Sequence, residues 1–246
     1  MNTVVIIQAR MSSTRLPGKV MKKLADRSVL AHVVNRLQTS RTLDAVVVAT
    51  TDNAVDDAIA AEASRYGAGV YRGSEADVLG RYHDAAREFA ADIVVRITSD
   101  CPLLDPELVD LMVRKFFSCP VVDYLSNTLE RTYPRGLDVE IFTRKALETA
   151  FRQAHEPFER EHVTPYMYQH GDVFSLVSQT QDVDHSACRW TLDTIDDWRF
   201  MEAVYHHLHR PGRVFATDEV LELLRRRPEI GQLNARVRQK ELEGSR

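Results

Sequence analysis

The stretch VVIIQARMSSTRLPGK, residues 4–19, joins a β-branched run to a polar, basic loop. Its first four residues are apolar in succession, which is typical of a strand covered on both faces in a parallel sheet. Similar runs follow at 45–49 (AVVVA) and 92–97 (DIVVRI). Helical patterns separate and follow these runs, at 29–38, 53–66 and 77–90. This order predicts an α/β fold with a doubly wound, mostly parallel sheet flanked by helices.

The pattern changes after about residue 120, where shorter elements are expected. We predict a strand at 137–142, helices around 144–169, and strands near 173–179 and 188–193. We interpret residues from about 120 to 190 as an insertion with return strands within a single domain over 1–246. The stretch from about 226 to 246 is dense in charge and is expected to be a solvated, partly helical tail.

Composition narrows the class of protein. Hydrophobic residues make up 44% and charged residues 28% of the 246 positions, as in a globular protein with a packed core. The net charge of -4 gives no overall basic field, so nucleic-acid binding is not expected. The three cysteines, at 101, 119 and 188, indicate neither a disulfide framework nor a zinc site. No signal peptide or membrane-spanning run is evident, and we expect a cytoplasmic protein.

The loop after the first strand carries three cations, Arg10, Arg15 and Lys19. Arginine forks, a lysine and loop N–H groups suit a nucleoside triphosphate, which carries about four negative charges near neutrality. The Walker pattern is absent, because Gly18 is the only glycine here and Val20 follows Lys19. The loop therefore predicts a polyphosphate site, with a solvent-exposed basic loop as the alternative.

Asp100 follows the run at 92–97, at the tip of the third predicted strand. Mg²⁺ prefers carboxylates, phosphate oxygens and water, so one or two aspartates suffice when a nucleotide supplies the other ligands. Asp193, which ends the run 189–192, is the natural second ligand. The alternative for each is a turn or cap residue. Asp105 and the pair at 196–197 are better interpreted as helix caps.

Several segments together resemble one family. The loop motif IIQARMSSTRLPGKV and the later segments are similar to the CMP-sugar synthetases, or cytidylyltransferases, above all the spore-coat polysaccharide biosynthesis SpsF-like and acylneuraminate cytidylyltransferase subgroup. The resemblance spans roughly residues 4–200. The later segments are VLGRY at 78–82, VRITSDCPLLDPELVD at 95–110, DYLSN at 123–127, GLDVEIF at 136–142, EREHVTPY at 159–166 and RWTLDTIDDW at 189–198.

The resemblance implies a nucleotidyltransferase with a fold like that of the nucleotide-diphospho-sugar transferases. It would move CMP from CTP to an acidic, acylneuraminate-like 2-keto sugar and release pyrophosphate, for surface polysaccharide or glycan synthesis, as a homodimer. Arg15, Lys19 and Asp100 would be catalytic, and Asp100 and Asp193 would bind Mg²⁺. The residues expected to border the nucleotide are Gln8, Ala9, Arg10, Ser13, Arg15, Lys19, Thr51, Asp52, Arg72 and Ser99.

Base and acceptor recognition rest on weaker patterns. Arg72 and loop carbonyls could read the cytosine edge, although Asp52 could instead cap a helix and Arg72 could lie on the surface. Asp138 and Glu140 alternate with Val139, so they are expected on one strand face, binding sugar hydroxyls or a second metal, unless that face is solvated. The other acceptor candidates are Tyr124, Asn127, Arg160 and His162, with Arg160 placed to fork onto a sugar carboxylate.

Two other functions remain open at this point. A metal-dependent glycosyltransferase that uses a nucleotide sugar could share the sheet, and its DxD motif has a nearest match in Asp138-Val139-Glu140. A non-catalytic nucleotide-binding subunit could keep the phosphate loop without turnover. The basic loop before Lys19 favours a triphosphate over a nucleotide sugar, and the joint presence of Arg15, Lys19, Asp100 and Asp193 favours an active enzyme.

Overall fold

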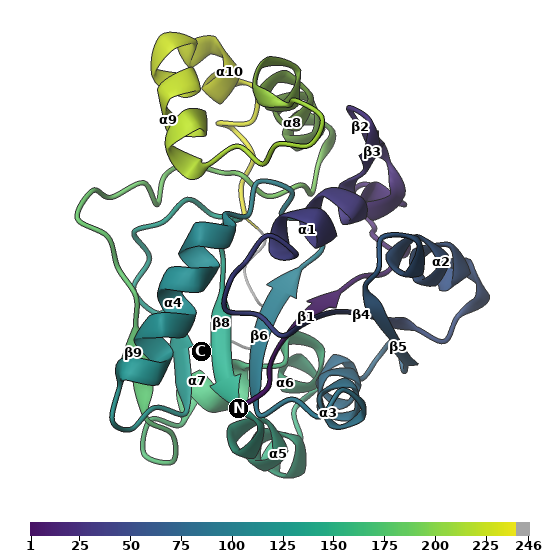
Figure 1. Cartoon of the computed structure of the whole chain (residues 1–246), viewed down its shortest axis with the longest axis vertical. Coiled ribbons are helices and arrows are strands. Elements are labelled where there is room, and N and C mark those ends of the chain that lie inside the picture. The colour runs from purple at the N-terminus through teal and green to yellow at the C-terminus, as the bar shows by residue number, and fades with distance from the viewer. Residues whose placement is uncertain (240–246) are drawn as a thin grey trace.

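A computed structural model describes residues 1–239 and contains a seven-stranded sheet of order β5-β4-β1-β6-β8-β7-β9 (Figure 1). Strands β5, β4, β1 and β6 run parallel, β8 is antiparallel to both of its neighbours, and β7 and β9 pair in parallel. The predicted mostly parallel sheet is confirmed. The strands are β1 Thr3–Gln8, β4 Ala45–Thr51, β5 Gly69–Gly73, β6 Ile93–Thr98, β7 Tyr124–Ser126, β8 Glu140–Thr143 and β9 Leu176–Ser178.

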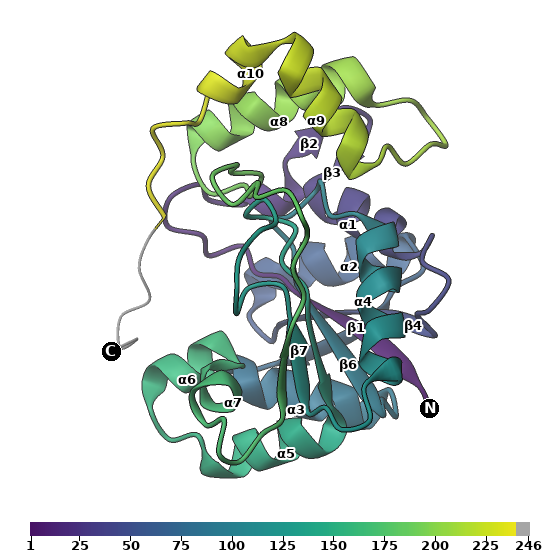
Figure 2. The same cartoon turned by 90° about the vertical axis from the view of Figure 1, so that its left-hand side faces the viewer.

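Helices cover both faces of the sheet, as the alternating order requires. One face carries α1 Val29–Leu37, α2 Asp57–Arg65 and α4 Pro106–Ser118. The opposite face carries α3 Val78–Glu88, α5 Arg144–Gln153, α6 Pro157–His162 and α7 Pro165–Gln169. Three further helices, α8 Ile195–Leu208, α9 Thr217–Arg226 and α10 Pro228–Gln232, form a group beyond the carboxyl ends of the central strands (Figure 2).

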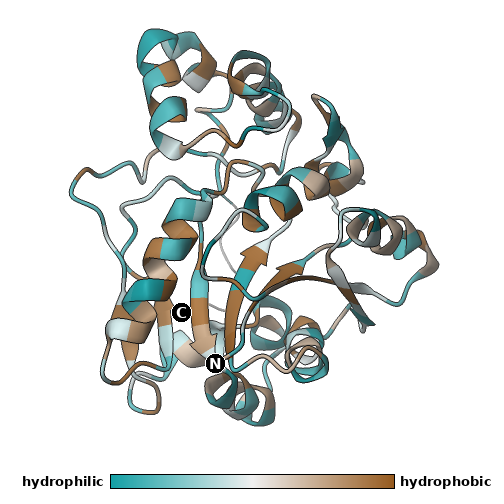
Figure 3. Cartoon of the chain, viewed as in Figure 1, coloured by the Kyte–Doolittle hydropathy of each residue, from teal (hydrophilic) through white to brown (hydrophobic). Residues whose placement is uncertain are grey.

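The first strand shows why the sheet is covered on both sides. Val4 and Ile6 pack into the apolar cluster that contains α3, whereas Val5 and Ile7 pack into the cluster that contains α1 and α4. All four side chains are fully buried, and the strands form the apolar centre of the molecule (Figure 3). Because strand side chains alternate between faces, an unbroken β-branched run fills two cores at once.

Short elements follow the phosphate loop and the end of β4. They are η1 Lys19–Met21, the two-stranded hairpin β2 Lys23–Leu24 and β3 Arg27–Ser28, and η2 Ala54–Asp56. Within residues 1–239, no helix combines the length and apolar character needed to cross a bilayer.

The predicted strand at 188–193 is wrong. Its backbone groups are divided between two segments, because Trp190 N donates to Arg135 O at 2.6 Å and Leu192 N donates to Asp100 O at 2.9 Å. Only an isolated bridge between Arg135 and Arg189 results. Two other predicted strands are shorter than expected, as β8 begins at Glu140 and β9 covers Leu176–Ser178. The predicted charged tail also includes the buried Asn234, while residues 240–246 lie outside the described chain.

Candidate active site

Three polar segments meet at the carboxyl edge of the sheet. They follow β1 (residues 9–19), β4 (52–53) and β6 (99–100). Strand β1 lies between β4 and β6, and Gln8 is level with Ala49 on one side and Thr98 on the other. The chain winds outward from β1 through β4 to β5 and then returns to β6, so this edge is a switch point where doubly wound folds place their ligands.

The loop after β1 is held from within and by Asp56, the last residue of η2. Ser13 N and Gly18 N both donate to Met11 O, at 2.9 and 3.1 Å. Gly18 has a φ of 64°, a left-handed conformation that favours glycine, and it precedes η1. Met11 N donates to Asp56 Oδ1 at 2.8 Å. The buried Asp56, which the sequence interpretation did not single out, therefore anchors the beginning of the phosphate loop.

Lys19 lies at the centre of a compact charge cluster. Its Nζ is 2.7 Å from Asp100 Oδ2 and 2.8 Å from Asp193 Oδ1, and Arg15 Nη2 is 3.0 Å from the same Asp193 oxygen. Lys19 is only 9% exposed. Burial lowers the Lys19 pKa, but the charges and hydrogen bonds of Asp100 and Asp193 outweigh it, so the pKa is raised and the ammonium is retained.

The two aspartates converge on a single cation. Burial raises the Asp100 pKa, but the opposing charge and hydrogen bond of Lys19 lower it below its usual value, so the carboxylate is ionised near neutrality. One oxygen from each aspartate already contacts the same positive centre. Oxygen donors of this kind fit a divalent cation such as Mg²⁺ that completes its shell with phosphate oxygens and water.

Asp193 reaches this cluster through side-chain contacts. Arg189 Nη2 donates to Asp193 Oδ2 at 2.9 Å, and the Asp193 N–H donates to Asp197 Oδ2 at 3.0 Å. Thr194, rather than the Asp196–Asp197 pair, is the N-cap of α8, and Asp197 completes a capping box with it. The expected cap at 196–197 is thus displaced to Thr194. Arg189 and Asp197 both lie in the motif RWTLDTIDDW, but the sequence interpretation gave neither a role in the site.

The other residues predicted for the phosphates lie along β1 and its loop. Ser99 N donates to Gln8 O at 3.2 Å, and Ala9 N donates to Ala49 O at 3.2 Å, so both backbones belong to the sheet edge. Arg10 is exposed and lies 3.6 Å from Glu75. Five of the predicted nucleotide residues therefore lie around the sheet edge: Gln8, Ala9, Arg10, Ser13 and Ser99. Of the other predicted nucleotide residues, only Arg15 joins Lys19 in the charge cluster.

Arg72 braces the loop after β4. Its Nε and Nη2 donate to Thr51 O and Asn53 O at 2.9 and 3.0 Å, and its Nη1 is 2.6 Å from Asp57. The Thr51 hydroxyl donates to Asp56, and Asp52 is exposed, with its N–H donating to Gly73 O at 3.0 Å. These contacts fix the geometry of the loop. If Arg72 recognises the base, it must do so with the guanidinium N–H groups that these contacts leave free.

Asp138 and Glu140 have different partners. Asp138 precedes β8 and receives two hydrogen bonds from the Arg131 guanidinium. Glu140 is buried, pairs with Arg96 and accepts hydrogen bonds from Tyr124 and Thr164, both at 2.6 Å. Strand β8 begins at Glu140, so Asp138 lies two residues before the strand.

The remaining acceptor candidates have structural partners. Asn127 is fully buried, donates to Leu137 O at 2.7 Å and accepts from Val139 N at 2.9 Å. Arg160 pairs with Asp77 and donates to Phe151 O at 2.9 Å. His162 is the half-buried last residue of α6. Neither Asn127 nor Arg160 contacts Lys19, Asp100 or Asp193 through a hydrogen bond or ion pair between described residues.

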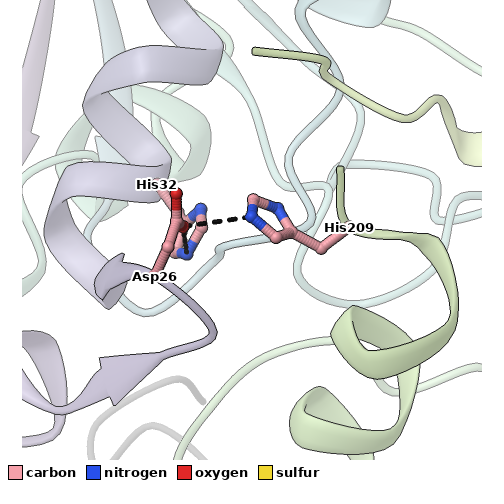
Figure 4. A group of neighbouring side chains, drawn as sticks. All are labelled: Asp26, His32 and His209. Carbon is pink, nitrogen blue, oxygen red and sulfur yellow. Dashed lines mark ion pairs between the residues drawn. The ribbon is translucent and has the colours of Figure 1, made fainter. Parts of the chain in front are cut away.

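A second cluster connects the hairpin after the loop to the end of α8. Asp26 Oδ1 is 3.1 Å from His209 Nε2 and 3.9 Å from His32 Nε2 (Figure 4). The three groups are close enough for a metal, but Arg27 donates to both Asp26 oxygens, and His32 Nε2 is 2.7 Å from Leu24 O. The cluster is better described as a polar tether between the hairpin and the end of α8. Burial lowers the pKa of His32 to about 4.

The sheet order and the edge that carries the charge cluster define a nucleotidyltransferase fold. The family model described as cytidylyltransferase matches residues 4–209, and the chain belongs to this family. The predicted family and enzyme class, a cytidylyltransferase of the CMP-sugar synthetase kind, are confirmed. Spore coat polysaccharide biosynthesis protein SpsF of Bacillus subtilis is 34% identical, over 93% of this chain and 97% of that protein.

Solved structures agree with this fold. A cytidylyltransferase from Leptospira borgpetersenii has 35% identity and a TM-score of 0.91 over 98% of this chain and all of its own. CMP:2-keto-3-deoxy-manno-octonic acid synthetase complexed with CTP shares the fold at 17% identity, with a TM-score of 0.65 over 84% of this chain and 99% of its own. A manganese complex of Rv0371c from Mycobacterium tuberculosis does so at 15% identity, with a TM-score of 0.58 over 82% and 97%.

Proposed function

We propose that this protein transfers CMP from CTP to an acidic 2-keto sugar, with Mg²⁺ held by Asp100 and Asp193. The observation that supports this proposal most strongly is the convergence of Asp100 Oδ2 and Asp193 Oδ1 on Lys19 Nζ at 2.7 and 2.8 Å. The arrangement offers a carboxylate pair for a metal and two cations, Lys19 and Arg15, for a polyphosphate. The CTP complex and the manganese complex belong to structural relatives and support the same choice of nucleotide and a divalent metal.

In this proposal the acceptor hydroxyl oxygen forms a bond to the α-phosphorus of CTP while the bond from that phosphorus to the bridging oxygen of pyrophosphate breaks. The hydroxyl proton passes to solvent or to a neighbouring carboxylate. Arg15 and Lys19 neutralise the charge that develops on the departing pyrophosphate. The metal, when bound, acts as a Lewis acid on phosphate oxygens. Asp100 and Asp193 raise the pKa of Lys19, so this side chain is cationic before the metal binds.

The acidic acceptor also requires a cation for its carboxylate, and Arg135 suits this role better than Arg160. Arg135 forms the backbone bridge with Arg189, whose side chain contacts Asp193. No hydrogen bond or ion pair between residues 1–239 engages the Arg135 guanidinium. Burial, together with the nearby charges of Arg131 and Arg189, lowers the Arg135 pKa. A bound anion would relieve this repulsion.

An Arg135→Ala variant tests this assignment. We expect its KM for the acidic acceptor to rise about tenfold or more, because a charge-assisted hydrogen bond contributes roughly 1.5–3 kcal/mol, while its KM for CTP changes little. Arg160→Ala is the comparison variant and should leave the acceptor KM nearly unchanged. An equal increase for both nucleotide and acceptor would contradict a specific role of Arg135 in acceptor binding.

Pyrophosphate release tests the overall function. The protein is incubated with Mg²⁺, pooled acidic 2-keto sugars and one of CTP, UTP, ATP or GTP at a time. We expect release from CTP only when metal and acceptor are both present. Release of UDP or GDP from a nucleotide sugar would instead identify a glycosyltransferase, an alternative for which the separate partners of Asp138 and Glu140 offer no support. CTP binding without turnover over the whole panel would identify a non-catalytic subunit.

A further inference from the structure

The chain beyond α10 runs back from the group of C-terminal helices (Figure 2), and it contacts Arg189 and Asp197. Asn234 lies on this returning segment and is only 4% exposed. Its Nδ2 donates to Arg189 O at 2.9 Å and to Asp197 Oδ1 at 3.0 Å. Five residues further on, Gln239 Oε1 accepts a hydrogen bond from Arg189 Nη1 at 2.7 Å. A region expected to be a solvated tail is therefore in contact with the residues that hold Asp193.

Arg189 determines which oxygen of Asp193 faces the charge cluster. Its Nε and Nη2 bind the two oxygens of Asp197 at 2.8 and 3.0 Å, and the same Nη2 binds Asp193 Oδ2 at 2.9 Å. Asp193 Oδ1 is then directed to Lys19. A planar guanidinium that serves two carboxylates cannot move from one without losing the other.

Asp197 provides the fixed end of this arrangement. Its side chain is fully buried and accepts hydrogen bonds from Arg189, from Asn234 and from the backbone of Asp193 and Thr194. These contacts and the Arg189 charge lower the Asp197 pKa against the opposing effect of burial. Asn234 supplies the only one of these contacts that comes from beyond α8, among the residues that the structure describes.

We propose that Asn234 is a positioning residue for the metal site: it holds Arg189 and Asp197 in place and thereby fixes the orientation of Asp193. The inference rests on the proposed function, in which Asp193 binds the divalent cation. It assigns to the C-terminal segment a role in metal affinity. Partners that orient a metal ligand typically contribute about 10–100-fold to metal affinity.

The test measures Mn²⁺ binding by electron paramagnetic resonance in the presence of CTP and without acceptor. For Asn234→Ala we expect Mn²⁺ to bind about tenfold more weakly than to the unmodified protein. At saturating metal, the kcat of this variant should approach that of the unmodified protein. The substitution would then weaken metal binding without slowing turnover. Asn2→Ala is the matched control: its Nδ2 donates to Phe89 O at 2.9 Å and to Ala90 O at 3.1 Å, at the opposite end of β1. This control should lose stability without a change in Mn²⁺ affinity.

Substitutions of Arg189 provide a second test, because the two explanations predict opposite changes in Mn²⁺ affinity. If Arg189 acted only as a nearby positive charge, Arg189→Gln would strengthen Mn²⁺ binding by removing repulsion. Positioning predicts the opposite, because the fork that orients Asp193 is lost. Arg189→Lys keeps the charge and loses the fork, so it should also bind Mn²⁺ more weakly. Thermal unfolding of each variant shows whether it is folded. Asn234→Ala, which retains both the Arg189 and the Asp197 side chains, decides the question if the Arg189 variants do not fold.

The outcomes separate the two proposals. Asn234→Ala with unchanged Mn²⁺ affinity, together with weakened binding in Asp193→Asn, would overturn the positioning role alone. Unchanged binding in Asp193→Asn would overturn the proposed metal site and the positioning role with it. Weaker binding in both variants, with an unaffected Asn2→Ala control, supports the inference.

Discussion

Asp100 and Asp193 meet at the same cation but are placed by different means. Asp100 follows β6, a central strand whose register with β1 is fixed by six paired positions. Asp193 lies on an extended segment with a single isolated bridge, and side chains of Arg189 and Asp197 hold it. One half of the site is therefore a consequence of sheet geometry, whereas the other half depends on a buried polar network.

This difference has a consequence for how each half responds to change. A sheet edge is supported by apolar burial over many residues, so single substitutions rarely move it. A buried polar network loses geometry when a single member is removed, because the remaining groups are left without partners. Substitutions at Lys19, His32 and Asp105 probe the contacts between the sheet and the segments that pack at its edge.

The largest effect on stability is expected from Lys19→Met, which removes the cation shared by the two halves. Breaking a buried ion pair by deleting one partner costs about 3–5 kcal/mol of unfolding free energy. Lys19 lowers the Asp100 pKa in the unmodified protein, so its contribution is present at neutral pH and is lost as the pH falls through the Asp100 folded pKa. In the variant this lowering disappears, so the loss of stability caused by the substitution should shrink as the pH falls from neutrality. Urea unfolding of both proteins from pH 7 to pH 3 measures this difference in unfolding free energy.

Lys23→Met is the control for that experiment, because Lys23 is an exposed residue of β2. It should change the unfolding free energy by less than about 0.5 kcal/mol. A Lys19→Met protein with the stability and pH slope of this control would show that the charge cluster does not join the two halves.

The next effect concerns the tether from the hairpin to α8. Because burial lowers the His32 pKa from 6.5 to about 4, the unfolded chain binds a proton first as the pH falls between these values. His32 should therefore lower the unfolding free energy by up to about 3 kcal/mol as the pH falls from 6.5 to 4. Below pH 4 it should cause no further loss. His32→Gln, which keeps a donor for Leu24 O, should show a flatter pH profile over that window. The same slope in His32→Gln and the unmodified protein would contradict this account.

The smallest effect is expected at Asp105, which joins α4 to the C-terminal helices. Its Oδ1 accepts from Glu107 N at 2.9 Å as the predicted cap of α4, and its Oδ2 accepts from Thr217 N at 2.8 Å. Asp105→Ala should cost about 1–2 kcal/mol of unfolding free energy, and Asp105→Asn less, because asparagine still caps a helix. Urea unfolding measures both variants. Equal losses in the two would indicate that the charge, rather than the cap, is what matters.

The sheet and the first half of the site could be predicted because local patterns determine them. The apolar run at 4–7 has one solution in a parallel sheet, and the carboxyl ends of its neighbours must share an edge, which brings Lys19 to Asp100. The helix cap at Asp105 likewise depends on a few adjacent residues.

The second half could not be predicted in the same way. The segment at 188–193 carries strand-forming residues, yet its N–H groups bind separate parts of the chain. The partners of Glu140 and Arg160 come from distant elements, so their pairing with Arg96 and Asp77 leaves no trace in sequence spacing. Asn234 stands in a charged stretch, and only the tertiary structure shows that it is buried.

The most direct test of the central claim is Mg²⁺-dependent pyrophosphate release from CTP in Asp100→Asn and Asp193→Asn, with Asp196→Asn as the control. Asp196 is a half-buried residue in the first turn of α8 that pairs with Arg199 at 3.0 Å. The account predicts that each of the first two variants loses at least about a hundredfold in kcat/KM, while the control retains full activity. Full metal-dependent turnover in both Asp100→Asn and Asp193→Asn would contradict the account.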